Sequence, residues 1–180
     1  MKDRWRGLTV ACIASGPSLT KEDCEAVRHM KCIVTNTTFR LAPWADALFA
    51  MDLKWWVEYH KEVAADFKGG IYSWSKVAAR YGPEPMDGKM AGFGNSGANA
   101  VSLAIHAGAS KVILLGYDCQ RTNGQSHWHG DHPKTLSNAR SIAIWPEKFK
   151  RLADYAKKQG VQVVNCSRVT ALTCFQRESL

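Results

Sequence analysis

Short apolar runs alternate with amphipathic stretches along the whole chain. The runs are rich in Val, Ile, Leu and Ala, and they lie near residues 8–14, 31–36, 47–51, 111–115 and 161–164. Continuous apolar runs of this length are typical of strands that are buried on both faces of a sheet. Between them, apolar residues recur at helical spacing over about 20–29, 53–65, 95–107 and 146–159.

This alternation of strands and helices predicts right-handed βαβ units and therefore a largely parallel sheet with helices on both faces. The sequence contains no internal repeat and no linker. We therefore expect a single α/β domain, Rossmann-like in architecture, over residues 1–180. Ligands of such sheets bind at the carboxyl ends of the strands, beside the point where the strand order reverses.

Residues 68–94 differ from the rest of the chain because they contain six glycines and two prolines. One short strand is expected inside them, at Ile71–Trp74, and the remainder is expected to be a long loop. Long loops in compact domains often cover or bind a ligand. We interpret this segment as a lid or acceptor-binding loop.

Composition narrows the class of protein. The chain is 46% hydrophobic and 22% charged, which is ordinary for a globular domain. It has no run of 18 apolar residues and no secretory signal at its start, so we expect no membrane partner and a cytoplasmic location. Its six cysteines include no C-x-x-C pair, and we expect them to be reduced.

The formal net charge of +8 favours an anionic partner such as a nucleotide, a sugar phosphate or a nucleic acid. The basic residues are scattered and form no block of five. A surface that is basic without any binding role is therefore an open alternative.

A histidine-rich segment carries the most conspicuous candidate chemistry. His127, His129, Asp131 and His132 match the H-x-H-x-D-H pattern of the metallo-β-lactamase hydrolases. Their two-metal site needs further ligands from later in the chain, but no histidine follows His132 and the only later aspartate is Asp154. The β–α alternation also differs from the hydrolase fold. We therefore assign no metal ligands, although zinc or nickel binding by this loop, or a wholly structural loop, stays open.

Two glycine-bearing turns point instead to an anionic ligand. Residues 15–18 (Ser-Gly-Pro-Ser) follow the first predicted strand, and residues 95–97 (Asn-Ser-Gly) open a buried helix. Glycine lets the backbone approach a phosphate, and a helix N-terminus supplies N–H groups and positive dipole. Asn36, Asp52 and Asp118 also come just after predicted strands. All these residues can converge at one edge of the sheet.

The order of these motifs resembles a known superfamily. It includes the family-42 bacterial sialyltransferases and the relatives of archaeal hydroxymethylpterin pyrophosphokinase and of the motility accessory factors that modify flagellin. The matching pieces are Gly16–Leu19, Thr35–Asn36, Ser96–Ala107, Val112–Asp118, Ser126–His127, and Val163–Cys166 running to Phe175. The short, single-domain form is similar to members found in bacteriophage genomes. The chain departs from the sialyltransferases at Cys119-Gln120 and in its three loop histidines.

The resemblance implies a domain that binds a nucleotide or a nucleotide-sugar donor, such as a CMP- or UDP-sugar. The residues it places around the nucleotide are Gly16, Pro17, Ser18, Asn36, Asp52, Asn95, Ser96, Gly97 and Tyr117. In the sialyltransferases a loop histidine is the general base and no metal is required. In the pyrophosphokinase branch ATP is used with Mg²⁺, for which Asp52 and Asp118 are the candidate carboxylates.

Three functions follow as hypotheses. The first is a nucleotide-sugar-dependent glycosyltransferase, with Asp118 orienting the substrate and a loop histidine removing the proton of the acceptor hydroxyl. Neutral histidine suits that role, and His127 is the first choice, followed by His129 and His132. The second is a Mg²⁺-ATP-dependent pyrophosphokinase, and the third is a non-catalytic module that binds a nucleotide or nucleic acid. The acceptor in the first case is a glycan or a nucleic acid.

Overall fold

A single parallel sheet organises the molecule. The computed structural model describes residues 1–136, 139 and 141–180. Every strand pairing in this described part of the chain is parallel, and the strand order is β5-β4-β3-β2-β1-β6-β7-β8. The strands are β1 (Thr9–Ile13), β2 (Lys31–Thr35), β3 (Ala47–Phe49), β4 (Gly70–Ser73), β5 (Glu84–Pro85), β6 (Lys111–Leu115), β7 (Gln162–Asn165) and β8 (Gln176–Arg177).

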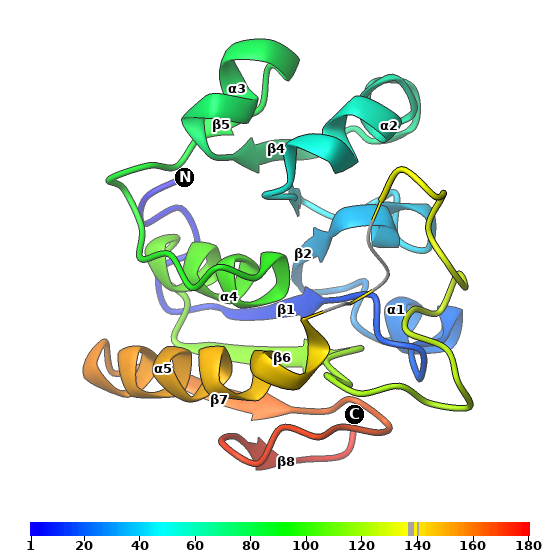
Figure 1. Ribbon diagram of the computed structural model, residues 1–180. Helices are drawn as coiled ribbons and strands as arrows, with labels where there is room; N and C mark the ends of the chain where they lie inside the picture. The colour runs from blue at the N-terminus through cyan, green and yellow to red at the C-terminus, as the bar shows by residue number, and fades with distance from the viewer. Residues whose placement is uncertain (137–138, 140) are drawn as a thin grey trace.

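Helices cover both faces of the sheet (Figure 1). They are α1 (Lys21–Ala26), α2 (Leu53–Asp66), α3 (Ser75–Tyr81), α4 (Ser96–His106) and α5 (Trp145–Lys158), with short 3₁₀ helices η1 (Asn36–Arg40) and η2 (Ile142–Ile144). Alternate residues of β1 enter different cores: Val10 and Cys12 pack with α4 and α5, whereas Ala11 and Ile13 pack with α1, α2 and α3. The predicted α/β class with helices on both faces is confirmed.

The strand order reverses between β1 and β6. Successive strands from β1 to β5 are added along one direction, and α4 then returns the chain to pair β6 with the other side of β1. Ile13 is in register with both Val34 of β2 and Leu115 of β6, so the three strands end at the same level. The connections after these ends diverge to opposite faces, which opens a crevice at this edge.

Local sequence signals explain the helix boundaries next to this edge. The Thr20 hydroxyl accepts from the Asp23 N–H, and the Asp23 carboxylate accepts from the Thr20 N–H, so a capping box starts α1. The α4 helix is buried along nearly its whole length because its small residues let four strands (β1, β2, β3 and β6) and α5 approach it closely.

The segment 68–94 is more ordered than its glycine content predicted. It contains β4, β5 and the seven-residue helix α3, and Gly82 ends α3 in the left-handed conformation. The expected short strand is present as β4, but the expectation that the remainder is a long loop is wrong, because Gly82 ends a helix rather than lying in one long connection. The longest irregular stretch of the segment lies after β5 and leads into α4.

Candidate functional site

A cavity of about 540 Å³ opens at the carboxyl ends of β1, β2, β3 and β6, at the crevice between β1 and β6. This is the place where open α/β sheets bind ligands, and the volume suits a ligand of nucleotide size. Of the residues predicted from the sequence, the cavity is lined by Gly16, Pro17, Asn36, Asp52, Asn95, Ser96, Gly97, Tyr117, His127 and His132. Ser18, Asp118 and His129 are not among the lining residues.

Asp118 and Ser18 are joined by two hydrogen bonds and do not line the cavity; we call this pair the clamp. The Asp118 carboxylate is 0% exposed and accepts hydrogen bonds from the Ser18 backbone N–H and the Ser18 hydroxyl, both at 2.8 Å. Gly16 lies against the same carboxylate, and a Cβ at this position would overlap Asp118 and the Gly116 carbonyl oxygen. Gly16 is therefore required for packing inside the protein, at a point where the sequence suggested approach to a phosphate.

The donors of the turn that contains Gly16 are already used. The N–H of Gly16 bonds to the Gly116 carbonyl at 2.8 Å and that of Leu19 to the Gly16 carbonyl at 3.1 Å, while Pro17 has no N–H. Since the Ser18 N–H bonds to Asp118, the N–H groups of Gly16, Ser18 and Leu19 are all engaged within the protein. Both donors of Ser18 are used on Asp118, and neither residue lines the cavity, so the structure does not bring the predicted phosphate-binding Ser18 and substrate-orienting Asp118 to the ligand space.

Burial acts in the same direction on the pKa of the two carboxylates expected to hold Mg²⁺, but only one of them lines the cavity. Burial raises the pKa of Asp118, and the hydrogen bonds from Ser18 oppose that rise. Burial raises the pKa of Asp52 too, with Lys148 opposing it, but Asp52 lines the cavity. The two carboxylates expected to hold Mg²⁺ together therefore do not face the same space, since only Asp52 lines the cavity.

The start of α4 keeps free backbone donors. The Asn95 side chain caps the helix by accepting from the Ala98 N–H at 3.1 Å, and the Ser96 hydroxyl accepts from the Met51 N–H at 3.2 Å. The N–H groups of Ser96 and Gly97 have no acceptor among the described residues, as expected for the first turn of a helix. They lie at the cavity wall together with Lys54, so this end of the cavity suits an anion.

Three buried side-chain atoms on the cavity wall have no hydrogen-bond partner within the described part of the chain. They are Asn36 Oδ1, Ser126 Oγ and His127 Nε2. The exposed fractions of Ser126 and His127 are only 3% and 7%, so bulk water does not satisfy them. Asn36 has a φ of 49°, a left-handed conformation that asparagine tolerates better than most residues. Because all three residues line the cavity, a polar ligand there is the candidate partner for these atoms.

The histidine loop is docked on the turn that follows β1. The Trp128 N–H bonds to the Ser15 carbonyl at 3.1 Å, and the Ser15 hydroxyl lies 3.2 Å from His127 Nδ1. A tight turn then reverses the chain, because the Gly130 N–H bonds to the His127 carbonyl at 3.1 Å with a φ of 79° at Gly130. This turn returns His132 to the side of His127, and it is the reason that residues five apart meet.

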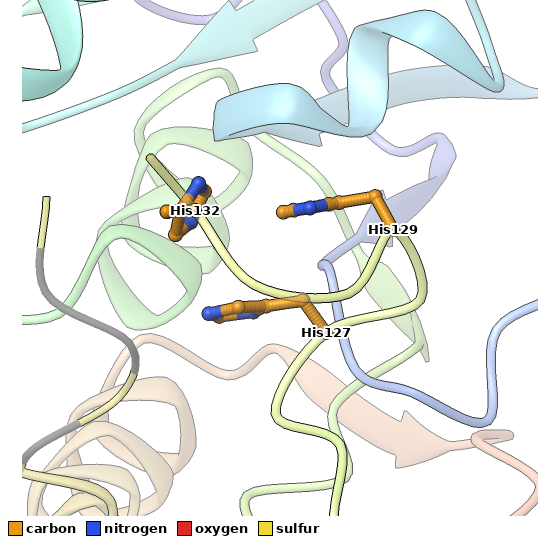
Figure 2. A group of neighbouring side chains, drawn as sticks. All are labelled: His127, His129 and His132. Atoms are coloured by element: carbon orange, nitrogen blue, oxygen red, sulfur yellow. The ribbon is translucent and has the colours of Figure 1, made fainter. Parts of the chain in front are cut away.

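Figure 2 shows that the rings of His127, His129 and His132 gather around one small space. One ring nitrogen from each lies within 4.8 Å of the others. Burial first, and the neighbouring His132 second, lower the pKa of His127 to about 4 and that of His129 to about 3; burial also lowers the pKa of His132. All three imidazoles are therefore neutral near pH 7. The sequence assigned no metal ligand here, yet the structure assembles three nitrogen donors.

Sequence reasoning missed other parts of the wall. Trp145 and Phe149 close it from α5, and neither carries a local signal because their helical periodicity indicates only a buried face. Ser15 was read as part of a phosphate-binding turn, whereas it orients His127. Its position directly after a strand end was the only signal available.

Comparison with known proteins adds no further identification. No protein-family model matches the chain, and no curated protein is significantly similar to it. Among the described residues, no helix has both the length and the apolar character needed to cross a membrane. The six cysteines are free thiols, and Cys12, Cys24 and Cys32 are buried.

Proposed function

We propose that the protein is a transferase of the glycosyltransferase kind, which binds a nucleotide-activated sugar donor in the cavity between β1 and β6. The observation that carries the proposal is the set of unpartnered atoms on the cavity wall: Asn36 Oδ1, Ser126 Oγ and His127 Nε2. Each such buried atom costs about 1–3 kcal/mol when no partner is present. A polar ligand at the switch point would recover that cost.

The phosphate groups of the donor belong at the start of α4. The free N–H groups of Ser96 and Gly97 and the nearby Lys54 provide hydrogen bonds and positive charge there. Asn36, which follows β2 and lines the same cavity, is the candidate to bind the base or ribose. The nucleotide role of Gly16 and Pro17 is then limited to shaping the floor of the cavity.

The chemistry assigned to the loop is removal of a proton. In the transfer, the acceptor hydroxyl oxygen forms a bond to the sugar carbon, the bond from that carbon to the donor phosphate breaks, and the nucleotide leaves with the electron pair. His127 Nε2 takes the hydroxyl proton, and Ser15 holds the ring through Nδ1. General base catalysis of this kind contributes roughly 10²- to 10⁴-fold. The net charge of +8 favours an anionic acceptor, either a glycan or a nucleic acid.

A nucleotide screen tests the binding part of the proposal. Thermal unfolding of the protein is followed with CMP, UDP, GDP, ADP and ATP, each with and without Mg²⁺. At least one nucleotide should raise the Tm without Mg²⁺, since a ligand that binds only the folded state stabilises it. If none does so at millimolar concentration, the donor site is absent and the proposal fails. A shift that strictly requires Mg²⁺ and ATP would replace it with the pyrophosphokinase alternative.

Two asparagines allow a matched pair of variants. Asn36→Gly removes the unpartnered amide while keeping the left-handed backbone, and it should weaken nucleotide binding by roughly 10-fold or more, the effect of losing one good hydrogen bond. Asn123→Gly makes the same change at an exposed residue with a φ of 51°, and it should leave binding unchanged. Equal losses in both variants would contradict the assignment of Asn36.

The proton-transfer role is tested separately. His127→Gln should keep the nucleotide-induced rise in Tm and lose release of nucleotide from a sugar donor. Turnover that survives this substitution would place the base elsewhere in the cavity.

A further inference from the structure

The histidine loop offers more nitrogen donors than one proton acceptor requires. His129 does not line the cavity, whereas His127 and His132 do, yet all three rings face one shared space (Figure 2). Two of the nitrogens in this group, His127 Nε2 and His129 Nε2, are buried and have no hydrogen-bond partner in the part of the chain that the structure describes. A role for His127 as a base leaves His129 unexplained.

We propose that His127, His129 and His132 form a binding site for one divalent transition-metal ion of the Zn²⁺, Co²⁺ or Ni²⁺ class, with its remaining coordination positions open to the cavity. The proposal goes beyond sugar transfer, because the site is defined by these three side chains and not by the nucleotide.

The separation of the rings fits a metal. Ring centroids are 5.2 Å apart for His127 and His129, and 4.7 Å for each of the other two pairs. A nitrogen–zinc distance of about 2.0–2.1 Å in a tetrahedral site places the centroids of two ligating imidazoles roughly 5 Å apart. The ligand nitrogens themselves must close to about 3.4 Å from separations of up to 4.8 Å. The planes of His127 and His129 are nearly parallel, at 8°, so these two rings must also turn for their nitrogen lone pairs to converge on one ion.

The surroundings of His127 are those of a metal ligand. A ligating histidine usually gives its second ring nitrogen to a hydrogen-bond partner that fixes its orientation. Ser15 Oγ is that partner for His127 Nδ1, at 3.2 Å, which leaves Nε2 for the metal. Nε2 binds either a metal ion or a proton, so the metal-loaded protein is expected to lack the proton-accepting role proposed above for this nitrogen. Ser15 is therefore a positioning residue of the proposed site. The turn closed by Gly130 is the second fixed element, because it sets the distance between His127 and His132.

The donor set selects the class of metal. Three neutral imidazoles suit zinc, cobalt, nickel and copper, whereas Mg²⁺ and Ca²⁺ prefer oxygen ligands. The nearby Arg40 is a potential source of repulsion, but it is paired with Glu62 through Nε and Nη2 at 2.5 and 2.7 Å. Three protein ligands leave a tetrahedral ion one exchangeable position. Since His127 and His132 line the cavity, that position would take water or an oxygen atom of a bound ligand.

Metal binding is measured directly on the purified chain after removal of metals with a chelator. Titration with Co²⁺ should give one equivalent per chain and a visible ligand-field spectrum, and Zn²⁺ should displace it. X-ray absorption at the cobalt edge should count three imidazole nitrogens. No stoichiometric binding, or a ligand count without three imidazoles, would overturn the proposal.

The variants separate this site from the donor site. His129→Ala removes a ligand and should weaken Co²⁺ binding at least about 100-fold. Ser15→Ala removes a group that only orients a ligand, and it should weaken binding roughly 10- to 100-fold. His29→Ala removes an exposed histidine after α1 and should change nothing. Unchanged binding in His129→Ala contradicts the site. Because His129 does not line the cavity, nucleotide binding by metal-free His129→Ala should equal that of the wild type, so failure of either proposal is seen independently.

Discussion

Two groups of buried polar atoms lie near the turn after β1, and they differ in whether they have hydrogen-bond partners. In the first, the Asp118 carboxylate accepts two hydrogen bonds from Ser18 and packs against Gly16. In the second, Ser126 Oγ and His127 Nε2 are also buried but have no partner among the described residues. Both groups come from residues that the sequence marks as candidates for function.

The difference separates structure from binding. A buried polar group that is fully hydrogen-bonded within the protein stabilises the fold. A buried polar group without a partner costs free energy until a ligand supplies a hydrogen bond to it. The Asp118 clamp is therefore part of the scaffold, and the unpartnered wall is the part that awaits a ligand. Substitutions in the two groups should have opposite consequences for stability.

The largest effect is expected at the floor of the clamp. In Gly16→Ala the new methyl group would overlap the Asp118 carboxylate and the Gly116 carbonyl oxygen, so the free energy of unfolding should fall by about 3 kcal/mol. Gly92→Ala is the control, because its Cβ would meet Trp74 at an ordinary 3.6 Å. Urea denaturation of both variants measures this. A stable Gly16→Ala protein would mean that the clamp is not tightly packed.

The next effect concerns the charge of the clamp. Asp118→Asn turns an N–H₂ group toward one of the two Ser18 donors, which should cost about 2 kcal/mol, in the range for hydrogen bonds to charged groups. Asp154→Asn, at an exposed position on α5, should change stability by less than about 0.5 kcal/mol. If Asp118→Asn kept full stability but lost turnover, Asp118 would regain the role at the substrate that the sequence suggested.

Removing an unpartnered atom from the cavity wall should not lower the free energy of unfolding. Ser126→Ala removes a buried hydroxyl without a partner, so the free protein should be as stable as the wild type or more stable by about 1 kcal/mol, while nucleotide affinity falls. Ser102→Ala provides the contrast: its equally buried hydroxyl donates to the Ala91 carbonyl at 2.7 Å, and its loss should cost about 1 kcal/mol. Denaturation with and without nucleotide distinguishes them. A destabilised Ser126→Ala would show that its hydroxyl is already satisfied.

The smallest effect lies at the surface beside the clamp. Arg168 holds Asp23 through Nε and Nη2, both at 2.9 Å, and Arg168→Ala should lower the free energy of unfolding only slightly at pH 7, because solvent screens an exposed ion pair. Partial burial of Asp23 acts to raise its pKa, but the hydrogen bonds from Arg168 and Thr20 together lower it. A lowered pKa in the folded state gives stability that is present above the unfolded value near 4 and is lost in acid.

Urea denaturation of the wild type and of Arg168→Ala should therefore show a difference in the free energy of unfolding at pH 7. This difference should shrink as the pH falls through the pKa of Asp23 in the folded protein. A difference of constant size at both pH values would assign the effect to packing of the Arg168 side chain rather than to its charge.

The sequence predicted the fold correctly where the pattern of apolar residues matches the faces that are buried in the structure. Apolar runs such as Lys111–Leu115 indicate strands buried on both faces, and Thr20 and Asp23 specify the start of α1 by themselves. Residues 68–94 were mispredicted because glycine marks helix ends as readily as loops, and only the pairing of β4 with β3 and β5 tells them apart.

The sequence by itself determined the α/β class, the strand ends that carry polar residues and the loop that holds three histidines. Tertiary structure alone decided which of those residues are free. Asp118 and His127 both follow strands or turns and both are titratable, but Asp118 is hydrogen-bonded to Ser18, whereas Nε2 of His127 has no partner among the described residues. The reason is that hydrogen-bond satisfaction depends on partners about 100 residues away, as Ser18 and Asp118 or Ser15 and His127 are, and no local pattern encodes those contacts.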